Sequence, residues 1–398
     1  MTHLVPVLRP VLGSPFRRAG LYRAAGEIPS WHIAPVRTGT VTDLISGSQI
    51  ITFTNSSPAM GFNSSGILVQ PAANVPFIEY DPATGSALGW RIWGAVVNLG
   101  LHSRDLTQAA WVASGITPTR DQVGADATAN TGTRLTATAS DGTILQTITS
   151  ASATRVSGFL IKRLTGTGVI QITQDGGATW NTVTITNQWL RYAIAAATVT
   201  NPQIGFRVRS SGDEIAVDFA QLQSSSVLGP PVPTTSLTAS STADVASITG
   251  AAFAGIYNST EATLFARWSS TANATQRCIF DVEQAASSSD RVDININTAN
   301  VINPRTVVSG AAVASLAGGT YTANTIGAIA FGYRAGDYAS SFNGASVVTD
   351  ATAGSLPASP ARLFIGSLNG LNYLNGYVRE MATFKSRRPN ANLQSMTQ

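Results

Sequence analysis

The sequence has little charge, only two lysines and very few residues of the kinds that build common catalytic and metal sites. Charged residues make up 12% of its 398 positions, about half the usual share. Helical proteins need charged outer faces, so this shortage argues against a mainly helical fold. The single cysteine, Cys278, excludes a disulfide-stapled scaffold and leaves the redox compartment open.

Candidate catalytic bases and metal ligands are equally scarce. The three histidines, His3, His32 and His102, leave Ser-His-Asp and Cys-His mechanisms almost without a base. No HExxH, Walker, GxGxxG or GxSxG pattern occurs, and one cysteine with scattered histidines cannot close a zinc site. Asp175 and Asp350 lack the spacing of several oxygen ligands that calcium requires. We therefore expect no metal and no cofactor.

Long hydrophobic runs are absent too. No run approaches the ~18 apolar residues of a membrane span. Arg9 and two prolines interrupt the apolar N-terminus before a secretory signal of the usual kind can form. We expect no membrane insertion, and we expect release with an assembled particle rather than ordinary secretion if the protein acts outside a cell.

Positive charge is present mainly at one end of the chain. The net charge is +4, and residues 1–37 account for all of it, with five arginines against Glu27. The remainder is balanced, with 20 basic and 20 acidic residues, so it has no excess to neutralise phosphates and we expect no nucleic-acid partner. The basic segment instead predicts a tether to another protein. Its candidate anchoring residues are Arg9, Arg17, Arg18 and Arg23.

Apolar and polar residues alternate over most of the chain, which predicts an all-β fold. Ile204, Phe206 and Val208, for example, interleave with Gly205 and Arg207, as in a strand with one buried face. About eight such runs follow one another at the spacing typical of sandwiches and jelly rolls, and a second alternating region comes later in the chain. We therefore predict two antiparallel β-sandwiches in tandem.

Prolines set the predicted boundaries. Five of them before residue 37 argue against a long helix or a central strand, and the stretch SSSVLGPPVPTTS has the composition of a linker. The predicted plan is an extended N-terminal arm (1–37), a small β-rich connector (38–100), a jelly roll (101–226), a linker (227–236) and a second sandwich (237–398). Only the C-terminal PNANLQSMTQ suggests a short helical turn, with Leu393 and Met396 three residues apart.

Paired carboxylates are the one catalytic pattern left to consider, because a glycosidase needs only two of them across a cleft. Asp281 and Glu283 are the best pair, two residues apart on one strand face. Two weaker pairs also occur, Asp290 with Asp293 and Asp213 with Glu214. Solvated strand faces and turns place charges at the same spacings. The sequence therefore predicts no catalytic residue and a protein that is not an enzyme.

Aromatic rings are the other signal for sugars, because exposed Trp and Tyr rings stack on sugar faces. Trp189 alternates with apolar neighbours and is expected in the core. Tyr333, Tyr338 and Phe342 flank a turn-rich stretch, GYRAGDYASSFNG, that fits the rim of a sandwich, and Tyr373 lies in a similar setting. These four residues are the candidate glycan-binding platform, provided that their rings are exposed.

Six segments of the chain stand out as a group. They are the connector at 52–89, NLGLHSRDLTQAAW, DFAQLQSSS, PTTSLTASSTADVASITG, GYRAGDYASSFNGASVV and RLFIGSLNGLNYLNGYVREMATFKSRRPNANLQSM. These segments resemble a family of bacteriophage and prophage structural proteins. The family comprises tail-fibre or head-spike proteins with a carbohydrate-binding-type jelly roll followed by a concanavalin A-like, or laminin G-like, domain.

This resemblance implies a virion appendage, located on the particle surface and extracellular after release. The expected partners are other virion proteins, from capsid, portal or tail, and a bacterial surface polysaccharide. A homotrimer is what the family implies. The leading interpretation is a non-enzymatic appendage that adheres to host glycan. A purely structural decoration protein, a polysaccharide depolymerase and a secreted carbohydrate-binding module remain alternatives.

Overall fold

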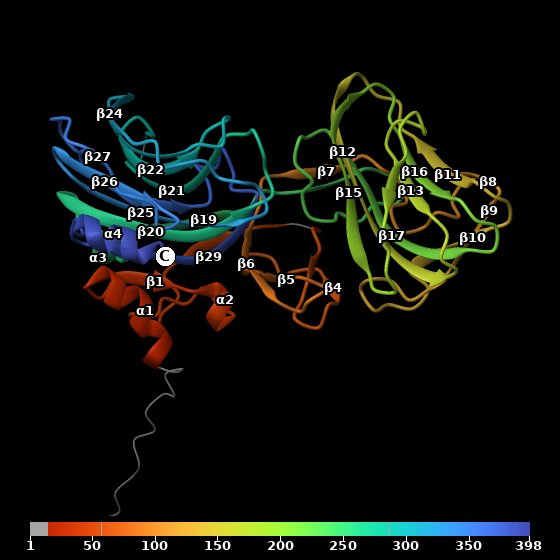
Figure 1. The fold of residues 1–398 in the computed structure, drawn as a ribbon, viewed down its shortest axis with the longest axis horizontal. Helices are drawn as coiled ribbons and strands as arrows, with labels where there is room; N and C mark the ends of the chain where they lie inside the picture. The colour runs from red at the N-terminus through yellow and green to blue at the C-terminus, as the bar shows by residue number, and fades with distance from the viewer. Residues whose placement is uncertain (1–14, 57, 286) are drawn as a thin grey trace, which may run out of the picture.

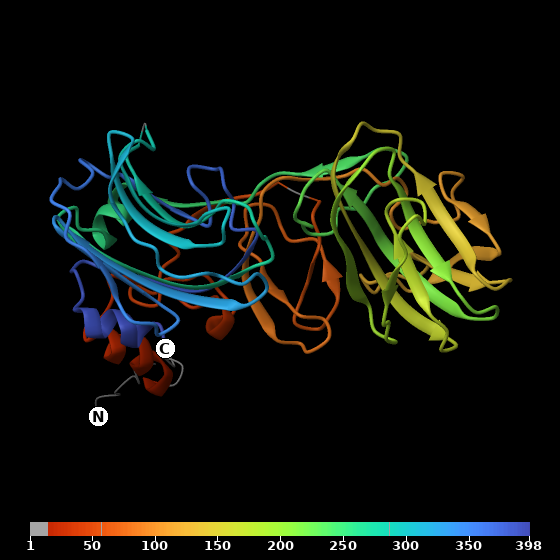
Figure 2. The same ribbon diagram turned by 45° about the horizontal axis from the view of Figure 1, so that its top comes forward.

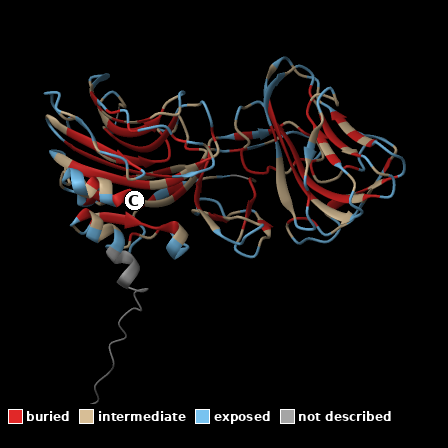
Figure 3. Cartoon of the chain, viewed as in Figure 1, coloured by how far each residue is buried: buried red, intermediate tan, exposed pale blue. Residues whose placement is uncertain are grey.

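The structure is a computed structural model that describes residues 15–56, 58–285 and 287–398. It is mostly β, with antiparallel sheets that form two sandwiches, which confirms the predicted fold class (Figures 1 and 2). The first sandwich extends from β8 to β17, and the second contains the strands from β19 onward together with β1, β2, β5 and β6. Buried residues concentrate along the strands of both (Figure 3).

The first sandwich stacks two five-stranded sheets. One has the order β15-β12-β17-β10-β9: Leu190–Val199, Ala153–Thr165, Glu214–Gln223, Gly132–Ala137 and Ile116–Gln122. The other has the order β14-β13-β16-β11-β8: Asn181–Val183, Ile170–Thr173, Gln203–Val208, Gly142–Thr147 and Val112–Ser114. The predicted alternation at Ile204, Phe206 and Val208 is confirmed, because all three side chains are buried in the core between the sheets.

The second sandwich stacks an eight-stranded and a seven-stranded sheet. The larger contains β27, β26, β25, β20, β29, β6 and β5, and β1 also pairs with β29: Val348–Asp350, Asp337–Phe342, Ile326–Arg334, Glu261–Ser270, Gly376–Phe384, Ala87–Ile92, Ile78–Tyr80 and Trp31–Ile33. The smaller has the order β2-β19-β28-β21-β22-β23-β24: Thr52–Thr54, Val245–Thr249, Arg362–Ile365, Arg277–Glu283, Arg291–Ile296, Ile302–Val308 and Ala311–Ser315.

Two small two-stranded sheets and four short helices complete the described part of the chain. Strand β3 pairs with β4, and β7 with β18: Gly61–Phe62, Leu68–Val69, Val96–Asn98 and Ala239–Ser241. The helices are α1 (Pro15–Ala25), α2 (Pro35–Thr38), α3 (Gly250–Ile256) and α4 (Asn390–Met396). Helix α4 confirms the predicted C-terminal turn, and its Leu393 and Met396 are buried.

The predicted extended arm at 1–37 is wrong for residues 15–37, and residues 1–14 lie outside the described part of the chain. Pro15 begins α1 and Pro35 begins α2, at the first helical position where proline costs no hydrogen bond. Between the helices, β1 pairs with β29, and Trp31 lies fully buried with its ring edge-on to Phe280 of the opposite sheet. Pro15 and Pro35 therefore lie at the starts of helices in a folded segment and do not keep it unfolded.

The predicted connector at 38–100 is not an independent unit either. Strand β2 joins the smaller sheet of the second sandwich beside β19, and β5 and β6 join the larger one beside β29. The hairpin β3–β4 instead packs on the first sandwich, where Phe62 and Leu68 meet Phe219. From Pro15 onward, the chain therefore contributes first to the second sandwich, then builds the first, and then returns to the second.

The predicted linker at 227–236 is packed and hydrogen-bonded rather than free. Gln221 holds it at two points, donating from Nε2 to the carbonyl oxygen of Pro230 (3.0 Å) and accepting from the N–H of Val232 (2.8 Å). Val232 is fully buried against Val96. Linker composition predicted the turn in the chain, but the side chains of β17 fix that turn in place.

Candidate binding cleft

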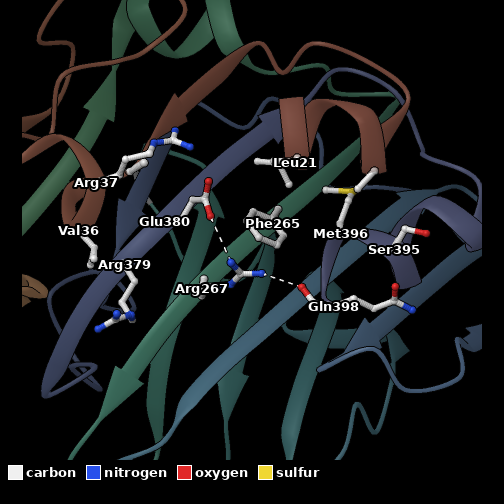
Figure 4. Close-up of a pocket in the computed structure, with 13 residues that line it drawn as sticks. Leu21, Val36, Arg37, Phe265, Arg267, Arg379, Glu380, Ser395, Met396 and Gln398 are labelled. Carbon is white, nitrogen blue, oxygen red and sulfur yellow. Dashed lines mark hydrogen bonds and ion pairs between the residues drawn. The ribbon is translucent and has the colours of Figure 1, made fainter. Parts of the chain in front are cut away.

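A solvent-open cleft of about 450 Å³ lies on the outer face of the eight-stranded sheet (Figure 4). Helices α1 and α4 pack together over one part of that face and α2 over another, which leaves the sheet between them uncovered. Strands β20 and β29 form its floor. Its size is within the 300–1,000 Å³ range, approximately, of small-molecule sites.

A β-bulge supplies two of the charged residues of the cleft. Arg267 on β20 pairs with Glu380 on β29, but the next residue, Trp268, pairs with Val378, so Arg379 is an extra residue. Val378 is buried in the core between the two sheets. Arg379 and Glu380 both line the cleft on the outer face, although regular alternation would place them on opposite faces.

Glu380 is held by histidine and arginine. His32 Nε2 lies 2.9 Å from its Oε1, and Arg267 Nη1 lies 3.7 Å from its Oε2. The other ring nitrogen of His32 lies 2.9 Å from the hydroxyl of Tyr22, so the imidazole bridges α1 and the sheet. Burial pushes the pKa of Glu380 up, but the His32 hydrogen bond and the nearby charges outweigh it and hold that pKa below its usual value. Glu380 is therefore ionised and already paired.

The rest of the charge in the cleft is positive. Arg37 from α2, Arg267 and Arg379 line it together with Glu380, so the side chains of the cleft include three guanidinium groups and one carboxylate. Burial, and then the charge of Arg267, lower the pKa of Arg379. The side chain of Arg267 remains 34% exposed, so this charge is accessible from solvent.

The opposite wall is apolar. Leu21 and Ala24 of α1 line it with Met396 of α4, and Phe265 lies beneath them on β20. Phe265 and Met396 belong to a buried cluster that fastens the two helices to the sheet, whereas Leu21 and Ala24 remain partly exposed. The cleft thus offers a charged side and an apolar side to one ligand.

The predicted aromatic platform is wrong for three of its four residues. Tyr333 and Tyr338 are fully buried and Phe342 is 8% exposed, all in the core of the second sandwich. The hydroxyl of Tyr333 donates to that of Tyr257 at 3.1 Å, which satisfies it internally. The turn-rich stretch between them is a two-strand hairpin whose ends enter the core, so the rings point inward.

The remaining predicted residues do not gather at the cleft. Tyr373 is half-buried and packs against the core of the second sandwich. Arg9 lies outside the described residues, as do the side chains of Arg17 and Arg18, while Arg23 is exposed on α1. Their predicted anchoring role is therefore not tested by the structure.

The predicted carboxylate pair is not accessible. Asp281 and Glu283 are both fully buried on β21, and Glu283 forms an ion pair with Arg362. Among the described residues, no group of three or more His, Cys, Asp or Glu side chains is placed to hold a metal ion. In that same part of the chain, no helix has the length and hydropathy of a membrane span.

Sequence reasoning missed the residues of the cleft. Arg37 was counted as charge on an arm, and Arg267, Arg379 and Glu380 were not singled out. The one available signal was local: in GYVREMATF, the adjacent Arg379 and Glu380 break the alternation of the strand. Such a break marks a bulge, and bulges occur next to binding sites.

Comparisons with known proteins give a fold likeness only. No protein-family model matches the chain, and no curated protein matches it in sequence. Among solved structures, the CBM40 module of a Ruminococcus gnavus IT-sialidase, bound to α2,3-sialyllactose, aligns with a TM-score of 0.31 and 13% identity over 35% of this chain and 84% of that one. The NanB sialidase of Streptococcus pneumoniae gives 0.30 and 13% over 34% and 24%, and a Trypanosoma rangeli sialidase gives 0.31 and 9% over 38% and 26%.

Proposed function

We propose that this protein is a non-enzymatic adhesion protein of a bacteriophage particle, which binds a polysaccharide on the host surface through the cleft described above. The observation that carries the binding proposal is the cleft itself, open to solvent and with one cationic and one apolar wall. Amphipathic sites of this kind suit sugars, whose rings present both apolar C–H faces and polar edges. The phage setting rests on the segments that resemble appendage proteins.

Because residues 15–37 are folded, fewer residues remain available for the proposed anchor. Residues 1–14, with Arg9, and the exposed side of α1, with Arg23, are the parts left to contact other virion proteins. A homotrimer, exposed on the particle surface, is the expected assembly. The burial of Asp281 and Glu283 supports the non-enzymatic part of the proposal, because a glycosidase needs carboxyls that reach the scissile bond.

The test fills the cleft from a glycine. Gly20 lines it from α1, and a Cβ added there would meet no atom within 4 Å, so Gly20→Phe places a ring in the cleft without a backbone clash. Gly255 on α3 is exposed and equally unobstructed, and it does not line the cleft, so Gly255→Phe is the matched control. Both variants are expected to fold, with the Tm of the parent.

We expect Gly20→Phe to lose binding to host cells and to their purified polysaccharide, while Gly255→Phe binds like the parent. Equal binding by both variants would remove the cleft from the proposal. If the parent binds no host polysaccharide yet is found in purified particles, a purely structural decoration protein is the correct interpretation. Release of reducing sugar from the polysaccharide would instead indicate a depolymerase.

A further inference from the structure

The charge of the cleft points to the class of sugar, an inference that rests on the proposed function. We propose that the cleft selects saccharides that carry a carboxylate group, with the guanidinium groups of Arg379 and Arg267 as the carboxylate-binding pair. Neither residue is needed to hold the two sheets together, because both lie on the outer face of the larger sheet. The argument begins with how their charges are balanced.

Glu380, the one acidic side chain of the cleft, is already paired, and Arg267 also donates through Nη2 to the main-chain oxygen of Gln398 at 3.2 Å (Figure 4). One oxygen of Glu380 contacts His32 and the other faces Arg267. No carboxylate among the described residues lies within ion-pair distance of Arg379. That guanidinium donates through Nη1 to the carbonyl oxygen of Leu88 at 2.7 Å, and to that of Ala87 at 3.5 Å. Its charge therefore has no protein counter-ion in this part of the chain.

Two guanidinium groups that line one cleft repel each other unless an anion lies between or beside them. Arg379 is half-buried, and Arg267 is near enough to lower its pKa, so solvent does not fully screen this repulsion. The planar guanidinium fork matches the two oxygens of a carboxylate, which it binds with paired hydrogen bonds. A bound carboxylate would relieve the repulsion. It would accept hydrogen bonds from the guanidinium N–H groups that do not already donate to main-chain carbonyl oxygens.

The size and the second wall of the cleft indicate that the anion is part of a larger molecule. A volume of about 450 Å³ equals that of about fifteen water molecules, far more than one small oxyanion fills. The apolar side, with Leu21 and Ala24 partly exposed, suits the C–H face of a pyranose ring next to the arginines. A sugar acid within a polysaccharide, such as a uronate, has both features.

The experiment compares each acidic oligosaccharide with its own carboxyl-reduced form, in which every carboxylate has become a hydroxymethyl group. Calorimetric titration of the full chain with a panel of uronate-containing oligosaccharides is expected to give a Kd about ten- to a hundredfold lower than with the reduced forms, the usual worth of hydrogen bonds to a charged group. A sulfated panel serves as a third arm and identifies a site that accepts any oxyanion.

Arg379→Gln and Arg267→Gln are expected to abolish most of this preference in a protein that still folds. Arg334→Gln is the matched control, because Arg334 is 59% exposed, pairs with Asp337 and does not line the cleft. Equal binding of acidic and reduced forms would overturn the inference, and if Gly20→Phe still blocks that binding, the proposed function stands. Binding of sulfated sugars only would overturn the carboxylate assignment. If no glycan binds, both proposals fail.

Discussion

At the scale of single residues, Asp281 is held in a form opposite to that of a surface carboxylate. It is fully buried on β21, and neither of its oxygens meets a hydrogen-bond donor among the described residues. Burial, with the charges of Glu283 and Asp293, raises its pKa to about 9. Glu283 Oε2 also lacks a donor, so a protonated Asp281 can donate to it and satisfy both carboxyls.

This raised pKa predicts that Asp281→Asn stabilises the protein at neutral and mildly alkaline pH. The folded protein keeps a proton that the unfolded chain releases above pH 4, so the stability of the parent falls from about pH 4 towards pH 9. Asparagine does not titrate, so its advantage is absent near pH 4 and grows by about 1.4 kcal/mol per pH unit above that, to several kcal/mol near pH 8. Urea unfolding at pH 4.5, 6.5 and 8 measures it.

Asp293→Asn is the control, with the opposite expectation. Asp293 is fully buried like Asp281, but it accepts from Arg291 at 2.6 Å and from Arg305 at 2.9 Å. Breaking a buried ion pair costs about 3–5 kcal/mol. If Asp281→Asn is less stable than the parent at pH 8, then Asp281 is ionised in the folded protein and the argument from its pKa is wrong.

The same scale explains why the site residues were hard to predict. Composition and turn content placed Tyr333 and Tyr338 on a rim, but a tight two-stranded turn leaves its flanking side chains free to face either side of a sheet. Which face is covered depends on the partner sheet, which a single sequence does not reveal. The arginines of the cleft belong to no motif, and the broken alternation at Arg379 is their one local signal.

At the scale of secondary-structure elements, alternation predicted most strands, whereas proline content misled the prediction near the N-terminus. A three-residue strand such as β1 is too short for a periodic signal. It is buried because it pairs with β29, where Trp31 lies opposite Thr383, a residue far away in the sequence. Prolines at helix starts and beside a short edge strand are compatible with folding. Long-range pairing, not local propensity, decided this segment.

Strand β7 ends in a residue whose side chain connects the segment that enters the first sandwich with the segments that leave it. Asn98 is fully buried, and its Nδ2 donates to the carbonyl oxygens of Ala220 and Val232, while its Oδ1 accepts from the N–H groups of Gly100 and Leu222. All four hydrogen-bonding positions of the amide are used. This residue opens the segment NLGLHSRDLTQAAW, which stood out in the sequence.

We expect Asn98→Ala to lower the free energy of unfolding by about 2–4 kcal/mol, because it leaves several buried main-chain groups without partners. Asn181→Ala, on the short edge strand β14, is the control and should change stability by less than about 0.5 kcal/mol. Chemical denaturation of both variants decides the matter. An equal and small effect would mean that water replaces the Asn98 amide.

At the scale of the whole molecule, the two sandwiches are not consecutive in the sequence. The first is inserted between two parts of the second, and β6 and β7 lead into it while the packed segment around Val232 leads back to β18. The sequence predicted a tandem arrangement because changes in composition along the chain are visible in it. Pairing between strands that are far apart in the sequence is not visible. The insertion makes the N-terminal quarter of the chain, from Trp31 to Ile92, essential to the second core.

This discontinuity sets the expected result of shortening the chain. Removal of residues 1–37 deletes α1, β1 and most of α2, and takes the buried ring of Trp31 out of the core. Losing a large buried aromatic side chain alone costs about 3–5 kcal/mol, a large part of the 5–15 kcal/mol or so that stabilises a typical domain. We therefore expect this variant to aggregate or to unfold at a much lower Tm.

Removal of residues 1–14 alone is expected to leave folding and glycan binding intact, because every described contact of both sandwiches remains. If these residues are the tether, the shortened protein will be missing from purified particles although it is soluble and binds polysaccharide like the parent. Calorimetry and immunoblotting of particles give the two readouts. Normal incorporation of the protein that lacks residues 1–14 would mean that the anchor lies in the folded part of the chain. An unchanged Tm after removal of residues 1–37 would instead support the original prediction of an extended arm.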